Sequence, residues 1–145
     1  MKKYGKPVMV LVLTALLAAM GAGCGGSQQT DSQSAEEKVF NIGIVQYVEH
    51  VALDSARQGF IDALADNGYV DGKNIKIDLQ NAQADQSNLS TISDRFVSNH
   101  VDLVLAIATP ATQAIAGKTT EIPILGTAVT DYVAARLVDS NEAPG

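Results

Sequence analysis

The sequence predicts an α/β fold, in which helices cover both faces of a parallel, doubly wound sheet. Short apolar segments rich in β-branched residues alternate along the chain with longer segments of helical periodicity. One strand-like segment, 101–108, is almost wholly apolar, as expected for a central strand that is covered on both faces. Strands that alternate with helices imply parallel pairing through right-handed crossovers. The expected sheet is therefore Rossmann-like or flavodoxin-like.

The first half of the predicted domain contains two strands and two helices. Residues 39–46 are apolar and β-branched, which favours a strand, and 74–79 alternate apolar with charged residues, which is typical of a half-exposed strand near an edge. A helix follows each strand, at 52–67 and at 86–99, and Gly68 supplies the stop signal of the first helix. The apolar helical faces comprise Leu53, Ala56, Phe60, Ala63 and Leu64 in the first helix, and Leu89, Ile92, Phe96 and Val97 in the second.

The second half repeats this pattern with shorter elements. The apolar strand 101–108 leads into a helix over 111–118, and a strand over 122–126 is entered through Pro123. A fourth helical segment is expected at 133–138. Residues 39–145 would then form one small α/β domain, able to bury roughly 60–65% of its unfolded surface.

The N-terminal segment predicts export and attachment to a lipid. Three lysines precede the apolar run 8–20, which is shorter than the span of about 20 residues that a membrane requires. We interpret 1–23 as a signal peptide that resembles a bacterial lipoprotein signal, in which Cys24 receives the lipid. The polar residues 24–38 suit a flexible tether, which would hold the domain at the cell membrane on the extracellular or periplasmic side. The alternative is an ordinary secretory signal followed by a free thiol.

Composition and charge exclude several classes of protein. With 46% apolar and 18% charged residues, the chain is not intrinsically disordered. A single cysteine excludes a disulfide scaffold and a cysteine-rich zinc site. Without the three lysines of the signal, the mature part has 7 basic and 16 acidic residues, a net charge of −9. This balance argues against a nucleic-acid partner, because nucleic-acid binding needs clustered lysine and arginine.

The ligand site of such a sheet is expected outside the carboxyl ends of the strands. Three predicted loops qualify, at 46–51, 108–112 and 127–131. The first of them has no glycine, so a dinucleotide pyrophosphate could not approach the backbone there. No serine lies on a G-x-S-x-G turn, and the two histidines lack carboxylates at metal-ligand spacing. We therefore expect no catalytic residues, no metal and no cofactor.

The loop at 108–112 carries features suited to a carboxylate. Thr109 is expected to be the N-cap and Pro110 the first residue of the following helix. The N–H groups of Ala111 and Thr112 would then be unpaired and could bind a carboxylate group of a ligand. The alternative is that Thr109 only caps its helix.

The other two loops supply polar and aromatic candidates. Glu49 could hold an ammonium group, with His50 beside it. The alternative is that both are solvated loop residues. Tyr47 could stack on an apolar ligand side chain, and Gln46 could contact the ligand or be buried and satisfied by the backbone. The remaining candidates are Thr130 and Asp131, of which Asp131 could simply cap the last helix.

Several short motifs together resemble one family of ABC-transporter substrate-binding lipoproteins, the tryptophan/tyrosine type. These motifs are Ile44-Val45-Gln46, Glu49-His50, Ala52-Leu53-Asp54, Gly72-Lys73-Asn74, Asn81-Ala82-Gln83, Ala108-Thr109-Pro110-Ala111, Ile122-Pro123-Ile124 and Ala128-Val129-Thr130-Asp131. The resemblance implies a periplasmic-binding-protein type I fold, whose two lobes close on a ligand, and delivery of that ligand to a membrane permease. Aromatic amino acids are among the ligands of this family. Two departures are Val51 and Tyr132, which stand where the family usually has proline.

Members of this family are longer than 145 residues, so we expect this chain to hold the N-terminal lobe, with the second lobe absent. The predicted function is that of a solute-binding lipoprotein of an ABC importer, which binds a small carboxylate-bearing solute and delivers it to a permease. An aromatic amino acid is the candidate solute. The alternatives are a membrane-tethered sensor or interaction domain on the same fold, and a truncated product without function. An exported enzyme is a weaker alternative, because the sequence offers no assembled nucleophile and base.

Overall fold

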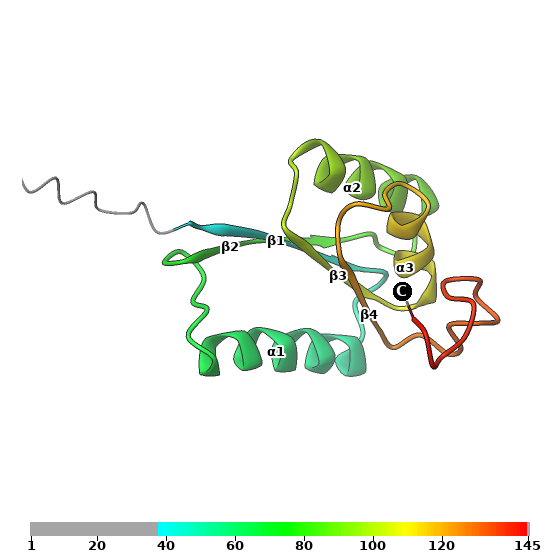
Figure 1. Ribbon diagram of the computed structural model, residues 1–145, viewed down its shortest axis with the longest axis horizontal. Helices are drawn as coiled ribbons and strands as arrows, with labels where there is room; N and C mark the ends of the chain where they lie inside the picture. Colours follow the sequence, from blue (N-terminus) through cyan, green and yellow to red (C-terminus); the bar gives the residue numbers. More distant parts are fainter. Residues whose placement is uncertain (1–37, 145) are drawn as a thin grey trace, which may run out of the picture. The chain divides into compact units, whose positions relative to one another are not determined.

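A parallel sheet of four strands, in the order β2-β1-β3-β4, forms the centre of the fold (Figure 1). The computed structural model describes residues 38–144, so the predicted signal, nearly all of the predicted tether and Cys24 lie outside the described residues. The elements are β1 (Phe40–Gln46), α1 (Val51–Asp66), β2 (Ile75–Asn81), α2 (Gln86–Ser98), β3 (Leu103–Ile107), α3 (Thr109–Ala116) and β4 (Ile124–Thr127). The predicted fold class and the order of these seven elements are confirmed. Within this part of the chain, no helix has the length and apolar character needed to cross a membrane.

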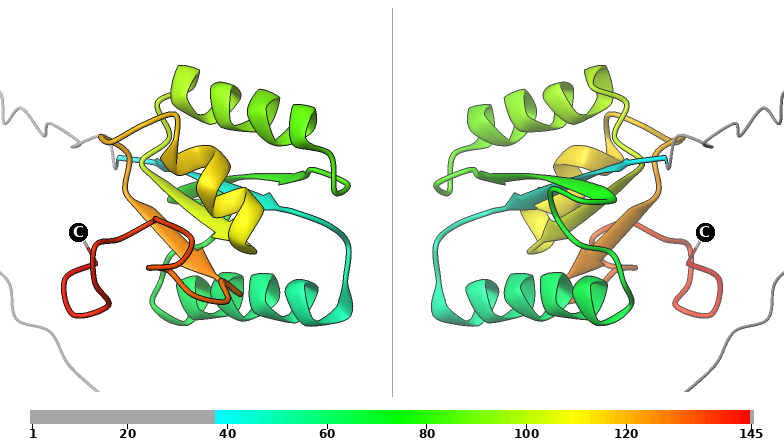
Figure 2. Two further views of the ribbon diagram at one scale, coloured as in Figure 1. Left: turned by 90° about the vertical axis from the view of Figure 1, so that its right-hand side faces the viewer. Right: turned by 90° about the vertical axis from the view of Figure 1, so that its left-hand side faces the viewer.

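The helices lie on both faces of the sheet. Figures 1 and 2 show α1 on one face, and α2 and α3 on the other. β1 pairs with β2 on one side and with β3 on the other. The strand order therefore reverses between β1 and β3, and the loops that follow these two strands flank the point at which ligands bind in sheets of this kind.

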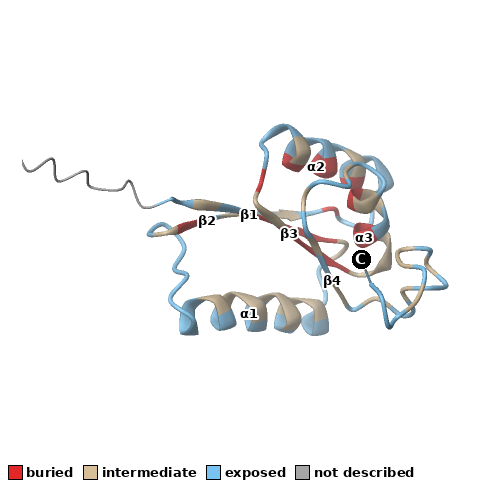
Figure 3. Ribbon diagram, in the orientation of Figure 1, coloured by how far each residue is buried: buried red, intermediate tan, exposed pale blue. Residues whose placement is uncertain are grey.

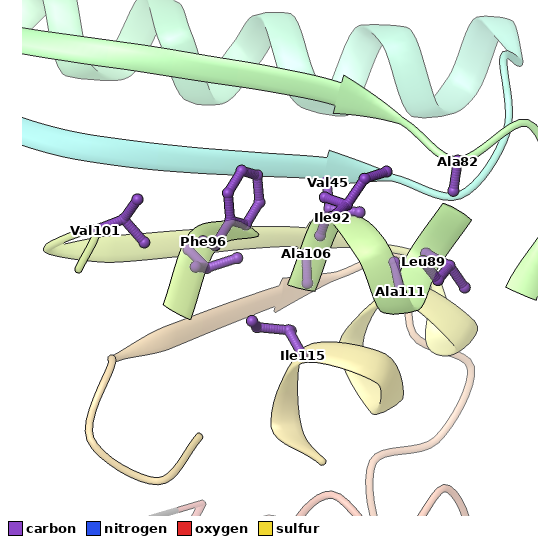
Figure 4. Packing of buried hydrophobic residues seen from close by; sticks show 10 residues of the cluster. Val45, Ala82, Leu89, Ile92, Phe96, Val101, Ala106, Ala111 and Ile115 are labelled. Atoms are coloured by element: carbon purple, nitrogen blue, oxygen red, sulfur yellow. The ribbon is translucent and has the colours of Figure 1, made fainter. Parts of the chain in front are cut away.

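Two apolar clusters, one on each face, form the core. Figure 4 shows the cluster below α2 and α3, which contains Val45, Leu89, Phe96, Val104 and Ile115 among others. The cluster facing α1 contains Ile42, Ile44, Ile75, Leu105 and Ile107. β1 and β3 are buried along most of their length, whereas β2 and β4 are largely accessible (Figure 3). The predictions of a central apolar strand at β3 and of an edge strand at β2 are both confirmed.

The ring of Phe96 lies directly against the backbone of β1. A Cβ atom added at Gly43 would lie 2.8 Å from Phe96 Cδ2 and 2.9 Å from Cε2. Both residues are buried, and β1 is held by strands on either side. Glycine at position 43 is therefore required by this close approach between α2 and the sheet.

α1 packs more loosely than the other two helices. Leu53, Phe60, Ile61 and Leu64 contact the cluster on its face of the sheet, yet α1, which lies wholly within the described residues, has no buried residue. Figure 3 shows the helix in the colours of intermediate and exposed residues along its whole length. The predicted apolar face is correct for Leu53, Phe60 and Leu64, and Ile61 completes it.

Val51, the first residue of α1, is suited to replacement by proline. Its side chain is 80% exposed, and the preceding residue, His50, has an extended backbone with φ −160° and ψ 137°. Proline at the first helical position needs no N–H donor, and it favours this backbone in the residue before it. We expect Val51→Pro to raise the free energy of unfolding by about 0.4–1 kcal/mol through the lower entropy of the unfolded chain. Urea unfolding followed by circular dichroism measures the change, and a lower stability than wild type would contradict it.

The segment after β4 contains a single helical turn, and the helix predicted at 133–138 is wrong. Asp131 Oδ1 accepts from Ala134 N at 2.9 Å, which starts the turn. Arg136 then adopts a positive φ of 57°, and Leu137 N donates to Tyr132 O at 2.9 Å. A left-handed residue, followed by an N–H that donates to the carbonyl five residues earlier, forms a Schellman motif. This motif ends the helix after one turn.

Tyr132 anchors this segment to the edge of the sheet. Its hydroxyl donates to the Gly126 carbonyl at 2.7 Å, and Gln113 Nε2 of α3 donates to Ala135 O at 2.9 Å. A Cβ atom at Gly126 would lie 3.0 Å from Tyr132 Cε1, so the ring lies close against β4. Tyr132 thus makes a contact with β4 that a proline could not make.

Candidate functional site

The loops at the carboxyl ends of all four strands are joined by backbone hydrogen bonds along one edge of the sheet. Tyr47 N, after β1, donates to Ile107 O at 3.2 Å, and Ala84 N, after β2, donates to Tyr47 O at 2.8 Å. Ala108 N, after β3, donates to Thr127 O of β4 at 2.9 Å. The three loops predicted to form the site are therefore adjacent, and the loop after β2 joins them. Asn81-Ala82-Gln83 was part of the family resemblance, but this loop was missed among the predicted site loops.

Strained backbone conformations concentrate at this edge. Four non-glycine residues that follow β2, β3 and β4 have positive φ angles, namely Gln83 (54°), Ala84 (58°), Ala108 (85°) and Ala128 (54°). Ala108, with ψ 153°, occupies a region of backbone space that is almost restricted to glycine. Such strain costs about 1–3 kcal/mol per residue and gathers at ligand-binding sites. It supports the placement of the site at the carboxyl edge.

The N-terminus of α3 differs from the prediction by one residue. The N-cap is Ala108 rather than Thr109, and the cap position supplies no side-chain hydrogen bond. Thr109 is the first helical residue, and its Oγ1 accepts from Thr130 N at 3.4 Å. The reason is the unusual backbone of Ala108, which turns the chain into the helix one residue early. Thr109 therefore ties the loop after β3 to the loop after β4 instead of capping its own helix.

The N–H groups at the start of α3 also differ from the prediction. Thr112 N donates to Ala108 O at 3.1 Å, so the expectation that this group is unpaired is wrong. Its hydroxyl donates to the same carbonyl at 3.1 Å. Ala111 is buried, and its N–H has no hydrogen-bond partner within residues 38–144. Because Pro110 has no N–H, the donors left for a ligand at this helix end are those of Thr109 and Ala111.

Gln46, at the end of β1, is fully buried, and its amide group is engaged by protein atoms. Nε2 donates to Val48 O at 2.8 Å and to Asp54 Oδ1 at 2.9 Å, while Oε1 accepts from Arg57 Nη1 at 2.8 Å. The predicted burial of Gln46 is correct, but two of its three partners are side chains rather than the backbone. Asp54 and Arg57 were missed as site residues, although their i,i+3 spacing on α1 signals an ion pair, here at 3.1 Å.

The rest of the first loop is more accessible. Tyr47 is half-buried, packs against the core cluster below α2 and α3, and donates from its hydroxyl to Ala84 O at 3.4 Å. Glu49 and His50 are both exposed. His50 is the N-cap of α1, because its Nδ1 accepts from Ala52 N at 3.2 Å. Glu49 therefore presents a carboxylate to solvent at this edge, next to a histidine that is engaged in helix capping.

The loop after β4 is exposed at Thr130 and Asp131. Thr130 is tied to Thr109 by its backbone N–H, and Asp131 caps the helical turn that follows it. The predicted alternative, that Asp131 is a helix cap, is thus correct, and the second carboxylate oxygen of Asp131 is left for other contacts. The structure brings Thr109 and Thr130 together and places Asp131 next to them.

The amino-terminal ends of the strands are a less suitable location for a ligand. A hollow of about 500 Å³ lies there between β1, β2 and the end of α2, but Arg95 Nε lies 2.7 Å from Asp78 Oδ2 and is already paired.

At the same edge, Asp102 accepts from Asn41 N at 2.8 Å and pairs with Lys38 Nζ at 2.9 Å. The backbone hydrogen bond and then the lysine lower the pKa of Asp102 below its usual 3.8. Asp102 thus stabilises the fold at neutral pH, and this stabilisation is lost as the pH falls below 3.8.

Comparison with known proteins identifies matches over most of the chain. A family model described as ABC transporter substrate binding protein matches residues 41–145. A "Tyrosine-binding protein" of Clostridioides difficile (strain R20291) is 46% identical over 146 residues, which cover 97% of this chain and 42% of that protein. The chain therefore spans less than half the length of this curated relative.

Two solved structures are similar in both sequence and fold. One is the ligand-free, open structure of a substrate-binding protein with adhesive properties from Clostridium difficile, with 52% identity and a TM-score of 0.69 over 70% of this chain and 34% of that one. The other is a protein from Streptococcus pneumonia in complex with L-Trp, with 42% identity and a TM-score of 0.71 over 74% of this chain and 36% of that one.

Proposed function

Because this chain belongs to the family of ABC transporter substrate-binding proteins, we propose that it forms one lobe of an extracytoplasmic protein that binds an aromatic amino acid and delivers it to a membrane permease. The observation that carries this proposal is the joined carboxyl edge of the sheet. The N-terminus of α3 and the loop after β1 both lie at this edge. The two relatives described as binding tyrosine and L-Trp support an aromatic ligand.

The carboxylate of the ligand would bind at the N-terminus of α3. The N–H groups of Thr109 and Ala111 lack protein partners within the described residues, and the helix dipole favours a negative charge there. Ala111 has no accessible surface, so a ligand oxygen would reach its N–H only after the surrounding loops move apart, and it would then satisfy a donor that is otherwise unpaired. Thr112 would support this end of the helix through its two bonds to Ala108 rather than contact the ligand by its N–H.

The other groups of an amino acid fit the neighbouring loops. Glu49 is an exposed carboxylate suited to the ligand ammonium group, and His50 fixes the start of α1 beside it. The half-buried ring of Tyr47 offers an aromatic surface for a ligand ring. Thr130 and Asp131 would form the opposite wall next to Thr109. Gln46 would act from beneath the loop, without contact to the ligand.

The proposal includes attachment of the protein to the membrane. Residues 1–23 would be a signal peptide, Cys24 would receive a lipid, and 24–38 would be a tether between the anchor and the lobe. Metabolic labelling of the expressed protein with a radioactive or clickable fatty acid tests this, with Cys24→Ser as the control that should lose the label. Labelling that persists in the Cys24→Ser variant would contradict the assignment.

A second candidate function is an interaction domain on the cell surface. The observation in its favour is that one similar protein of known structure is described as having adhesive properties. Binding of the exported protein to host cells or matrix proteins would test it, with saturating tyrosine present as a control that separates adhesion from ligand binding.

Ligand binding can be tested in a hybrid protein in which this chain replaces the matched segment of the C. difficile relative. Isothermal titration with L-Tyr, L-Trp and L-Phe should give saturable binding, and L-Ala should give none. A flat titration with all three aromatic amino acids would contradict the proposed ligand class.

We expect Thr109→Val to weaken binding of the preferred amino acid to the hybrid by about 0.5–1.5 kcal/mol, the contribution of one neutral hydrogen bond. The substitution removes the Thr109 hydroxyl that accepts from Thr130 N, so the loops on either side of the proposed carboxylate position lose their connection. Thr109→Ser keeps the hydroxyl and is the matched control, with affinity close to wild type. Equal affinity of the valine variant would show that the Thr109 hydroxyl has no part in the site.

A further inference from the structure

A closed ring of hydrogen bonds lies beneath the first loop of the proposed site. Arg57 Nη1 lies 2.8 Å from Gln46 Oε1 and 3.1 Å from Asp54 Oδ1, and Asp54 Oδ1 lies 2.9 Å from Gln46 Nε2. The side chain of Gln46 has no accessible surface, whereas those of Asp54 and Arg57 are 33% and 24% exposed. The ring therefore joins a buried amide of β1 to a half-buried ion pair of α1.

This ring fixes the orientation of the amide. A guanidinium group only donates hydrogen bonds and a carboxylate only accepts them. Gln46 must therefore turn its oxygen toward Arg57 and its nitrogen toward Asp54. A rotated amide would place its oxygen against the Asp54 carboxylate and its nitrogen against the Arg57 guanidinium, so both contacts would become repulsive.

The fixed amide has one N–H left, and this N–H holds the loop. It is donated to the Val48 carbonyl at 2.8 Å. Tyr47 is anchored to β3 and to the loop after β2, and His50 is anchored to α1. Val48 lies between these anchors, immediately before the exposed Glu49. The path of the backbone through Val48 determines where the Glu49 carboxylate lies.

We infer that Arg57 is a positioning residue for the proposed ligand-binding loop 47–50, and that it acts through Gln46 and the Val48 carbonyl. This inference rests on the proposed function for the part that concerns the ligand. The contacts that carry this role are those of Arg57 Nη1 with Gln46 and Asp54. The positioned group is the ammonium-binding carboxylate of Glu49.

Two measurements on Arg57→Met test the inference. Hydrogen exchange of the full ligand-free chain reports on the loop through the two hydrogen-bonded amides that flank it, those of Tyr47 and Ala52. We expect both amides to exchange about 10–100-fold faster, as the loss of a charge-assisted bond implies. In the hybrid protein we expect the affinity for L-Tyr to fall by a similar factor. Arg57→Lys keeps a charged donor and should recover part of both effects, which distinguishes positioning from simple loss of packing.

Arg95→Met is the matched control. Arg95 also pairs with an aspartate, Asp78, at 2.7 Å, but it lies at the opposite edge of the sheet. This variant should leave the exchange of the Tyr47 and Ala52 amides and the affinity unchanged. If Arg57→Met fails to fold, Asp54→Asn, which weakens the same ring while keeping Arg57, replaces it and carries the same expectation.

The outcomes separate the inference from the proposed function. Unchanged exchange of the Tyr47 and Ala52 amides in the Arg57→Met chain would overturn the inference, whatever the affinity. Faster exchange with unchanged affinity would overturn the link between the loop and the ligand. If the wild-type hybrid binds no aromatic amino acid, the proposed ligand class fails, and the exchange experiment still decides whether Arg57 positions the loop.

Discussion

Gly43→Ala is expected to lower the free energy of unfolding by about 3 kcal/mol, at the upper end of the range for an overpacked core. The added methyl group would lie 2.8–3.0 Å from three ring atoms of Phe96. The ring cannot move away because it is itself fully buried, and β1 cannot move because it is paired on both sides. Urea unfolding followed by circular dichroism measures the loss, and a cost below about 0.5 kcal/mol, typical of surface substitutions, would contradict the close contact.

A double-mutant cycle identifies Phe96 as the cause. Phe96→Leu alone should destabilise the fold, but in the Gly43→Ala background the smaller side chain makes room for the new methyl group. We expect a favourable coupling energy of about 1–2 kcal/mol between the two positions, whereas strictly additive effects would show that they are independent. Gly59→Ala is the control, since it adds the same methyl group in α1, where nothing lies within 4 Å. It should stabilise the fold by about 0.5–1 kcal/mol.

The isolated chain is expected to bind L-Tyr at least about 100-fold more weakly than the hybrid protein, a difference of about 2.7 kcal/mol in binding free energy. Ligand pockets bury roughly 70–90% of the surface of a small ligand. The carboxyl edge of one sheet contacts a ligand from one side, with Glu49, Thr130 and Asp131 all exposed to solvent. The second wall of the pocket has to come from elsewhere.

Isothermal titration of both proteins under the same conditions measures this difference. The isolated chain is first shown to be folded by a cooperative urea transition, so that weak binding is not confused with unfolding. Equal affinities of the two proteins would contradict the prediction and would mean that one lobe forms a complete site. A hybrid that also fails to bind would instead count against the proposed ligand.

The strands and the two long helices could be predicted from the sequence because their signals are local. The uninterrupted apolar run at β3 and the apolar–charged alternation at β2 each report directly how many faces of the strand are covered. The predicted edges differ from the observed ones by at most two residues, since hydrogen bonding rather than composition determines where an element ends. The helix predicted at 133–138 was wrong because Arg136, an ordinary helix former, adopts a left-handed conformation there.

The location of the candidate site could be predicted from topology, but its internal contacts could not. The loops that follow parallel strands had to lie at one edge of the sheet, where ligands bind. In contrast, the N-cap of α3 depends on a positive φ at Ala108, and alanine gives no signal for that conformation. The bonds from Gln46 to Asp54 and Arg57 depend on the rotation of α1 relative to β1, which only the folded structure determines.

The loose packing of α1 has a consequence for how ligand binding would spread through the lobe. A helix without buried side chains contributes little cooperativity to the core and is a natural candidate for the first unit to open in sub-global unfolding. Its N-terminal half nevertheless carries Asp54 and Arg57, which hold the amide beneath the ligand loop. A ligand that immobilises this loop would therefore lower the opening probability of the entire helix. Binding of a small solute would then stabilise α1 against opening as far as Asp66, well beyond the residues that the solute contacts.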